Sequence, residues 1–211
     1  RGLQLASIIR VTDSELKSRM AKVCNQGYVA DAPELLVFIV DTHRAQRIME
    51  EKDQVGIGAR SMYAFGEGWT DSCLMAQNMV VAAESLGLGT NYFGSVLNDP
   101  AQVIDILGLP ELTFPVVGLG IGYPDQDPQL KPRMEMSLRV MNNGYVEPDS
   151  WVSALVDYDE AMQTYYDLRE NGRRSDRYTQ QIVDKFATDT LPHRQLLRYV
   201  QAQGWDLALE D

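Results

Sequence analysis

The chain has 211 residues, and its 30 Asp and Glu residues outnumber its 19 Lys and Arg residues, so the formal net charge is −11 at pH 7. Hydrophobic residues make up 45% of the chain and charged residues 23%, which excludes a disordered or low-complexity protein. An acidic chain is poorly suited to binding nucleic acid or an anionic membrane, so we expect neither as a partner. Any anionic ligand therefore needs a local basic cluster.

The two cysteines, Cys24 and Cys73, form neither a disulfide framework nor a zinc-binding pattern. We expect no metal site and a reducing, cytoplasmic setting. No apolar stretch approaches the roughly 20 residues that span a bilayer. The chain begins with Arg1 rather than Met, so we expect the natural N-terminus to lie further upstream.

The first elements alternate between strand and helix. Residues 7–11 predict a short strand or an extended entry segment, and Thr12 to Glu15 match a capping box that opens a helix over about 13–24. The residues Asn25-Gln26-Gly27 end that helix. Residues 35–40 form a continuous apolar run typical of a strand buried on both faces.

The middle of the chain carries an unusually apolar helix. Residues 43–52 are polar and predict a helix or a loop. Thr70-Asp71 resembles a cap for a helix over about 71–86 that is apolar nearly all round. Such a helix is buried in a core or against a partner subunit.

Two further strands and several helices complete the chain. We expect strands at 90–95 and 114–121, separated by a helix that Asp99-Pro100 opens and that ends near Leu107. Later helices are predicted at about 157–169, 178–187 and 192–203. The fold class is therefore α+β, as one domain over 1–211 with a C-terminal helical extension from about residue 150.

The glycines of residues 118–122 do not predict a dinucleotide-binding loop. That fingerprint requires a helix directly after the glycines, whereas Tyr123-Pro124 closes a turn here. Close packing within a strand explains these glycines better.

Two basic clusters stand out against the acidic composition. In Lys131-Pro132-Arg133, alternation along an extended, proline-stiffened segment places both cations on one side, which suits a phosphate group. A solvated loop is the alternative. The second cluster follows Tyr165-Tyr166, and it suits either a phosphate or the helix C-terminus; it comprises Arg169, Arg173, Arg174 and Arg177. Two clusters indicate two phosphate-bearing ligands.

Several segments together resemble the nitroreductase superfamily, and more narrowly its branch of NADPH-dependent FMN reductases and oxygen-insensitive nitroreductases. The strongest are AAESLGLG, which ends at Gly89, and LKPR at 130–133. The others are Gln4–Arg10, Asn25–Val29, Ala76–Asn78 and the pair Tyr165-Tyr166 followed by Arg169. The resemblance covers essentially the whole chain, which starts after the N-terminal helix of the family.

The resemblance implies a homodimer with a central antiparallel-type sheet and FMN at the subunit interface, with helix 71–86 in the dimer core. Gln26 would bind the flavin or ribityl edge. Phe93, Gly94 and Ser95 would run along the isoalloxazine ring, although Ser95 stands where a glycine is usual. The predicted phosphate-binding residues are Lys131 and Arg133 for FMN, and Arg169 with Arg173 or Arg174 for NADPH.

The implied function is an NAD(P)H-dependent flavin oxidoreductase. Hydride passes from NADPH to FMN in a ping-pong cycle that then reduces nitroaromatics, quinones or free flavin. The reaction takes place on the flavin, so no catalytic side chain is predicted. One alternative is a non-catalytic flavin carrier or redox sensor on the same fold. Another is an acidic α+β protein that holds no cofactor and uses its apolar helix only to dimerise.

Overall fold

The structure is a computed structural model that describes residues 2–125, 129–169, 176–187 and 195–207, without the side chains of 166–169. It divides into two compact units. Unit 1 comprises Arg1–Pro124 and Leu191–Asp211, and unit 2 comprises Asp125–Thr190. The single domain expected over residues 1–211 stays a prediction.

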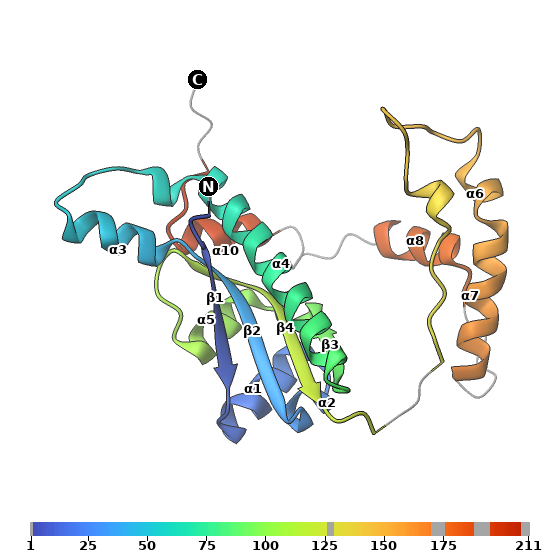
Figure 1. Ribbon diagram of the computed structural model, residues 1–211, viewed down its shortest axis with the longest axis horizontal. Coiled ribbons are helices and arrows are strands. Elements are labelled where there is room, and N and C mark those ends of the chain that lie inside the picture. Colours follow the sequence, from blue (N-terminus) through green and yellow to red (C-terminus); the bar gives the residue numbers. More distant parts are fainter. Residues whose placement is uncertain (1, 126–128, 170–175, 188–194, 208–211) are drawn as a thin grey trace. The chain divides into compact units, whose positions relative to one another are not determined.

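The centre of unit 1 is an antiparallel sheet with the strand order β1-β2-β4-β3 (Figure 1). Its members are β1 (Ala6–Val11), β2 (Glu34–Asp41), β3 (Gly89–Phe93) and β4 (Thr113–Gly122). The antiparallel-type sheet and all four strands predicted from the sequence are thus confirmed, although Gly94 and Ser95 lie beyond the end of β3.

Strand β2 is buried on both faces, as its continuous apolar run predicts. Its alternate side chains Leu35, Val37 and Ile39 belong to a core shared with α1 (Ser14–Cys24) and α5 (Pro100–Leu107). Leu36 and Phe38 belong to another core, which includes Ala76 and Val80 of α4 (Met62–Ser85). The sheet is therefore covered by α1 and α5 on one face and by α4 on the other (Figure 1).

Helix α1 begins one residue later than predicted. The N-cap is Asp13 rather than Thr12, because the Asp13 carboxylate accepts hydrogen bonds from the backbone N–H groups of Glu15 (2.8 Å) and Leu16 (3.0 Å). The predicted end is confirmed, with Asn25 in the left-handed region at φ 51°.

Helix α4 is longer than predicted. It begins at Met62, where Ser61 Oγ accepts a hydrogen bond from the backbone of Ala64 (3.2 Å). Thr70 is no cap, because its hydroxyl donates to the carbonyl of Gly66 (2.9 Å) inside the helix. Asp71 instead accepts a hydrogen bond from the backbone N–H of Leu5 (2.9 Å). No helix in the described ranges has the length and apolar character needed to cross a membrane.

The burial of α4 is one-sided within the single chain. Its inner face contributes Phe65, Ala76 and Val80 to the cores described above and below. Its outer face exposes Tyr63, Leu74 and Val81 to 77%, 65% and 58% of their surface. The other helical elements of unit 1 are α2 (Tyr28–Asp31), α3 (His43–Glu51), α10 (Leu196–Ala202) and the short turns Gly58–Arg60 and Gly94–Leu97.

An aromatic cluster attaches the C-terminal residues to unit 1. The ring of Phe65 lies 5.0 Å from that of Trp205 and 5.8 Å from that of Phe114, both edge to face. Trp205 is 1% exposed. This burial explains why residues near the end of the chain belong to the same unit as the sheet.

Unit 2 is mainly helical among its described residues. Its elements are the turn Met136–Leu138, α6 (Trp151–Ala154), α7 (Val156–Arg169) and α8 (Tyr178–Ala187). The buried carboxylate of Asp159 on α7 accepts hydrogen bonds from the backbone N–H (2.9 Å) and hydroxyl (2.6 Å) of Thr179. This interaction holds the start of α8 against α7, because those N–H groups have no partner within the helix.

The glycines of β4 make room for neighbouring side chains, which confirms the packing interpretation. A Cβ at Gly118 would lie 3.1 Å from Cβ of Phe93, and one at Gly120 would lie 3.0 Å from its ring atoms Cε2 and Cζ. A Cβ at Gly122 would lie 2.8 Å from Pro33. The absence of side chains at these positions lets Phe93 and Pro33 pack closely against the strand.

We expect Gly120→Ala to lower the free energy of unfolding by about 1–3 kcal/mol, because the added methyl group overpacks the contact with Phe93. Gly66→Ala is the matched control, since a Cβ there meets no atom within 4 Å. It should raise stability by about 0.5–1 kcal/mol through helix propensity. Urea unfolding followed by circular dichroism measures both changes. A loss of stability in the control as large as that of Gly120→Ala would contradict the packing explanation.

Candidate functional site

Two segments that carry predicted flavin-binding residues meet in unit 1. One is the loop between α1 and α2, which contains Gln26, and the other is the turn Gly94–Leu97 that follows β3. The hydroxyl of Ser95 donates a hydrogen bond of 2.6 Å to Oε1 of Gln26, although the two residues lie 69 positions apart. The structure therefore brings together Gln26, Gly94 and Ser95.

The backbone on both sides of this contact is fixed by hydrogen bonds. Gln26 donates to the carbonyl of Ala21 and accepts from the backbone of Val29, each at 3.1 Å. The carbonyl of Ser95 accepts from the backbone N–H of Asn98 at 3.0 Å. The Asn98 side chain in turn donates to the carbonyl of Cys24 at 3.4 Å. The two segments thus form one connected network.

Phe93 and Gly94 face different environments although they are adjacent. The Phe93 side chain is 2% exposed, and its ring centroid lies 5.9 Å from that of Tyr28. Gly94 is exposed, and a Cβ there would meet no atom within 4 Å. Phe93 therefore anchors the end of β3, while the backbone of Gly94 is open to the approach of a planar group.

Cys24 is part of this network, and the sequence analysis missed it. The residue is 2% exposed, and burial raises the pKa of its thiol above the usual value, while interaction with the Ser95 side chain acts weakly in the opposite direction. The thiol therefore stays protonated at neutral pH. The sequence does show that Cys24 ends α1 on the same buried face as Met20. It does not show the contact with Ser95, because Ser95 lies far away in the sequence.

The predicted phosphate-binding residues lie in unit 2, in a segment without regular secondary structure. Lys131 and Arg133 are both exposed. Arg133 Nη1 donates to the carbonyls of Lys131 (3.0 Å) and Pro132 (3.2 Å). The guanidinium thus folds back on its own loop through Nη1, and its other nitrogens donate to no group among the described residues. Their predicted role stays a prediction.

The predicted NADPH-binding residues fall at the limit of the described chain. Arg169 is the last residue of α7, and its side chain lies outside the described residues. Arg173 and Arg174 lie in the range 170–175, which is also outside them. Their assignment stays a prediction.

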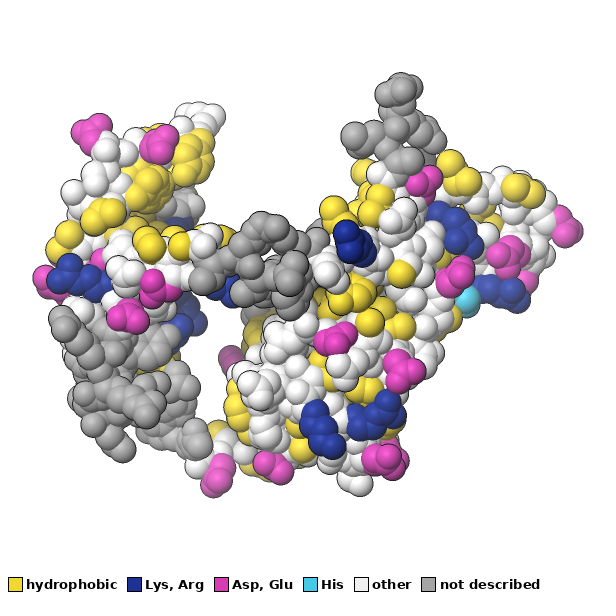
Figure 2. Space-filling view, turned by 180° about the vertical axis from the view of Figure 1, so that it is seen from behind, with side chains coloured by type: hydrophobic (Ala, Val, Ile, Leu, Met, Phe, Trp, Pro, Cys, Tyr) yellow, Lys and Arg dark blue, Asp and Glu magenta, His cyan; other side chains and the backbone are white. Residues whose placement is uncertain are grey.

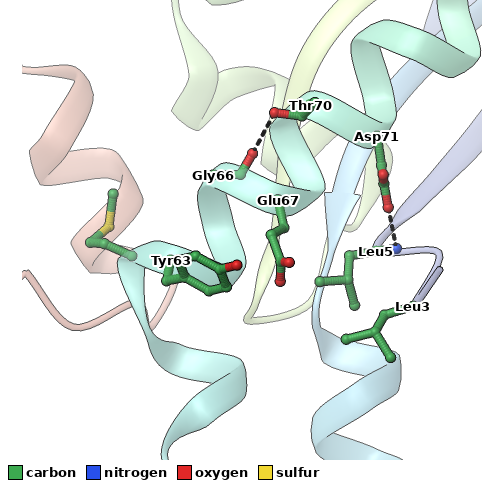
Figure 3. Close-up of a pocket in the computed structure, with 8 residues that line it drawn as sticks. Leu3, Leu5, Tyr63, Gly66, Glu67, Thr70 and Asp71 are labelled. Atoms are coloured by element: carbon green, nitrogen blue, oxygen red, sulfur yellow. Dashed lines mark hydrogen bonds between the residues drawn. The ribbon is translucent and has the colours of Figure 1, made fainter. Parts of the chain in front are cut away.

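A groove of about 570 Å³ lies elsewhere in unit 1, beside the first half of α4 (Figure 3). Leu3 and Leu5 of the N-terminal segment face Tyr63 and Glu67 of the helix across it. The hydrogen bond from Leu5 to Asp71 closes one side. None of the predicted ligand-binding residues that the structure describes lines this groove, and Gln26, Gly94 and Ser95 lie outside it.

The surface reflects the mixed composition of the chain. On the face shown in Figure 2, acidic and basic side chains of the described residues are interspersed. The acidic excess of the whole chain means that a phosphate group approaches against the overall charge. A local cation pair such as Lys131 and Arg133 would be needed to hold it.

Two family models together match nearly the whole chain. The model described as "Nitroreductase family" matches residues 2–123, and the one described as "Nitroreductase family, C-terminal domain" matches residues 131–208. The chain belongs to the nitroreductase family. The first matched region ends at residue 123, next to Pro124, where the first segment of unit 1 ends.

Relatives of this nitroreductase carry related names. The NADPH-flavin oxidoreductase of Vibrio harveyi is 38% identical over 203 residues, which cover 96% of this chain and 81% of the relative. The oxygen-insensitive NADPH nitroreductase of Salmonella typhimurium is 35% identical over 204 residues, with the same two coverages of 96% and 81%.

Solved structures resemble this nitroreductase over nearly its full length. The NfrA2 structure of B. megaterium has a TM-score of 0.89 at 30% identity and covers 98% of this chain and 83% of its own. The NADPH:FMN oxidoreductase of Vibrio harveyi complexed with NAD+ has a TM-score of 0.83 at 36% identity, with coverages of 97% and 81%. These similarities confirm the predicted family and fold class.

The burial of Cys24 predicts low thiol reactivity in this nitroreductase. Cys73→Ser leaves Cys24 as the only thiol, and we expect it to react with an aromatic disulfide reagent far more slowly in the folded chain than in urea. The cause is both its burial and the raised pKa of the thiol. Absorbance of the released thiolate measures the rate. Equal rates with and without urea would contradict the buried position.

Proposed function

We propose that this chain is an FMN-dependent oxidoreductase that takes hydride from NADPH in a ping-pong cycle and reduces nitroaromatics, quinones or free flavin. The names of the relatives support the donor and the flavin chemistry. Under this proposal residues 1–211 act as one FMN-binding domain in a cytoplasmic homodimer.

The observation that carries the proposal is the contact between Gln26 and the turn at Gly94–Ser95. The hydrogen bond of 2.6 Å joins residues from segments that are distant in the sequence, and these are the positions assigned to flavin binding. Beside the contact lies the open backbone of Gly94. A neutral amide next to an unobstructed peptide group fits the polar edge of an isoalloxazine ring.

Bound FMN would supply the redox chemistry, by accepting a hydride at N5 and passing two electrons to the acceptor. The chain contributes binding and orientation. Gln26 would donate a hydrogen bond to the ring or ribityl edge, and the backbone of Gly94 and Ser95 would line the ring. Phe93 supports this backbone from the core, where its ring packs against Gly118 and Gly120. Such fixed polar groups need little reorganisation during reaction.

Lys131 and Arg133 are proposed to hold the FMN phosphate. The hydrogen bonds from Arg133 to two carbonyls of its own loop fix one guanidinium nitrogen, and the remaining donors suit a phosphate oxygen. Lys131 adds a point charge from the same short segment.

The outer face of α4 supports the proposed homodimer. Tyr63, Leu74 and Val81 are more than half exposed on one helix, which leaves apolar surface that a second copy of the chain would bury. The charged residues of α4 are Glu67, Asp71 and Glu84, and of these only Glu84 is exposed. Analytical ultracentrifugation measures the association directly.

Lys131→Ala and Arg133→Ala test the phosphate assignment. We expect each to weaken FMN binding by about 10-fold or more, because a charge-assisted hydrogen bond is lost. Riboflavin, which has no phosphate, should bind the variants and the original chain equally. Lys52→Ala, which removes an exposed lysine at the end of α3, is the control. Quenching of flavin fluorescence measures both affinities.

The two alternative functions, a protein without cofactor and a flavin carrier or redox sensor, predict different results for flavin binding and for NADPH oxidation. If the chain binds neither FMN nor riboflavin, the cofactor-free alternative replaces the proposal. If it binds FMN but an added acceptor produces no steady NADPH oxidation, the protein is a flavin carrier or redox sensor. An equal loss of FMN and riboflavin affinity in Arg133→Ala would contradict the phosphate assignment.

Arg169→Ala tests the NADPH assignment. We expect it to raise the KM for NADPH by about 10-fold or more, because Arg169 would bind the 2′-phosphate, and to change the KM for NADH little. Arg198→Ala, on the exposed side of α10, is the control. Steady-state oxidation of the two nucleotides at a saturating acceptor concentration measures both constants. Equal effects on NADPH and NADH would show that Arg169 does not discriminate between them.

A further inference from the structure

The Gln26 amide is held by one end only. Its Oε1 accepts the hydrogen bond from the Ser95 hydroxyl at 2.6 Å. Within the described ranges, no group accepts a hydrogen bond from its Nε2. The carbonyl oxygen and the amino group of a glutamine are separate branches of one planar amide, and only the amino group donates. Bonding of the carbonyl to Ser95 therefore leaves a donor at the other side of the group.

The direction of the Ser95 hydrogen bond follows from its surroundings. The thiol of Cys24 interacts with the Ser95 side chain, and its burial keeps it protonated. The carbonyl oxygen of an amide only accepts, whereas a hydroxyl can donate. Gln26 Oε1 is the acceptor at hydrogen-bond distance. The Ser95 hydroxyl therefore donates to the Gln26 amide.

The three residues have little freedom to rearrange. Cys24 is the last residue of α1, and the backbone of Gln26 makes two hydrogen bonds of its own. Ser95 lies in the turn that Asn98 closes. Because the backbone is fixed at each position, the motion left to the Gln26 amide is rotation of its own side chain, and the hydrogen bond from Ser95 opposes that rotation.

We propose that Ser95 is a positioning residue, whose hydroxyl orients the Gln26 amide so that Nε2 donates to an acceptor atom of the flavin, such as a ring carbonyl oxygen. This inference rests on the proposed flavin site and specifies how that site recognises the ring. The amide would bind a carbonyl oxygen or an unprotonated ring nitrogen and would not accept from the N–H of the pyrimidine part. Without the hydroxyl, both amide orientations become accessible and the flavin must select one.

Ser95→Ala is the first test, because it removes the hydroxyl and leaves the backbone and Cβ in place. We expect FMN and riboflavin to bind about 3- to 10-fold more weakly. Both lose affinity because the contact is with the ring, which distinguishes this variant from Lys131→Ala. Ser95→Thr keeps a hydroxyl and should restore most of the affinity. Fluorescence quenching measures all four values.

Two Gln26 variants test the donor and the coupling. Gln26→Glu keeps an acceptor for Ser95 but replaces the Nε2 donor by a carboxylate oxygen, so we expect at least the loss seen in Ser95→Ala. In the Gln26→Ala background, Ser95→Ala should have no further effect, because the hydroxyl then has no amide to orient. Unchanged flavin affinity in Gln26→Glu would overturn the assigned orientation, and fully additive losses would overturn the coupling.

A measurement without flavin separates this inference from the proposed function. In the ¹⁵N-labelled full chain, the side-chain NH₂ signals of Gln26, assigned by their loss in Gln26→Ala, should show an ordered amide. In Ser95→Ala they should show fast local motion, and in Ser95→Thr they should be ordered again. Equal order in the original chain and in Ser95→Ala would overturn the inference.

The outcomes of the two experiments are distinct. If the original chain binds neither flavin, the proposed function fails regardless of the amide signals. If the original chain binds FMN and Ser95→Ala binds it equally well, the proposed function stands and the positioning role of Ser95 is overturned. Loss of amide order together with weaker binding of both flavins supports the inference.

Discussion

The candidate site depends on the packing of one aromatic ring against the sheet. Phe93 ends β3 and contacts Gly118 and Gly120 of β4, where an added Cβ would lie 3.1 and 3.0 Å from it. The turn Gly94–Leu97 follows directly, and it brings Ser95 to the loop that follows α1. The glycines of β4 thus act at a distance, since they fix the strand whose end carries the proposed flavin-binding backbone.

The acidic composition imposes a second constraint, on where ligands with phosphate groups can bind. With a net charge of −11, the chain repels anions over long distances, although salt screens this effect beyond about 8–10 Å. Short-range binding then has to come from clustered cations. Under the proposed function, the neutral groups around Gln26 bind the uncharged ring, and the cations Lys131 and Arg133 bind the phosphate.

Local patterns in the sequence predicted most of the elements but not all of their ends. The apolar run of β2 and the Asp99-Pro100 cap of α5 are local signals, and both predictions were confirmed. The predicted start of α4 was nine residues too late, because Thr70-Asp71 has the composition of a helix cap. The structure uses Asp71 to bind Leu5 instead, and such a long-range partner leaves no mark in the local sequence. Resemblance to a family, rather than pattern, identified Gln26, Gly94 and Ser95 together.

The contact between Ser95 and Gln26 illustrates what neither pattern nor resemblance supplies. The resemblance assigns both residues to the flavin, and it marks Ser95 only as a departure from glycine. The structure adds that the Ser95 hydroxyl donates a hydrogen bond of 2.6 Å to Gln26. The Ser95 side chain also interacts with the buried thiol of Cys24. Under the inference drawn above, the serine at this position determines which atom of the amide faces the ring. The hydroxymethyl group that distinguishes serine from glycine acts here by orienting a neighbouring side chain, and it introduces no charge.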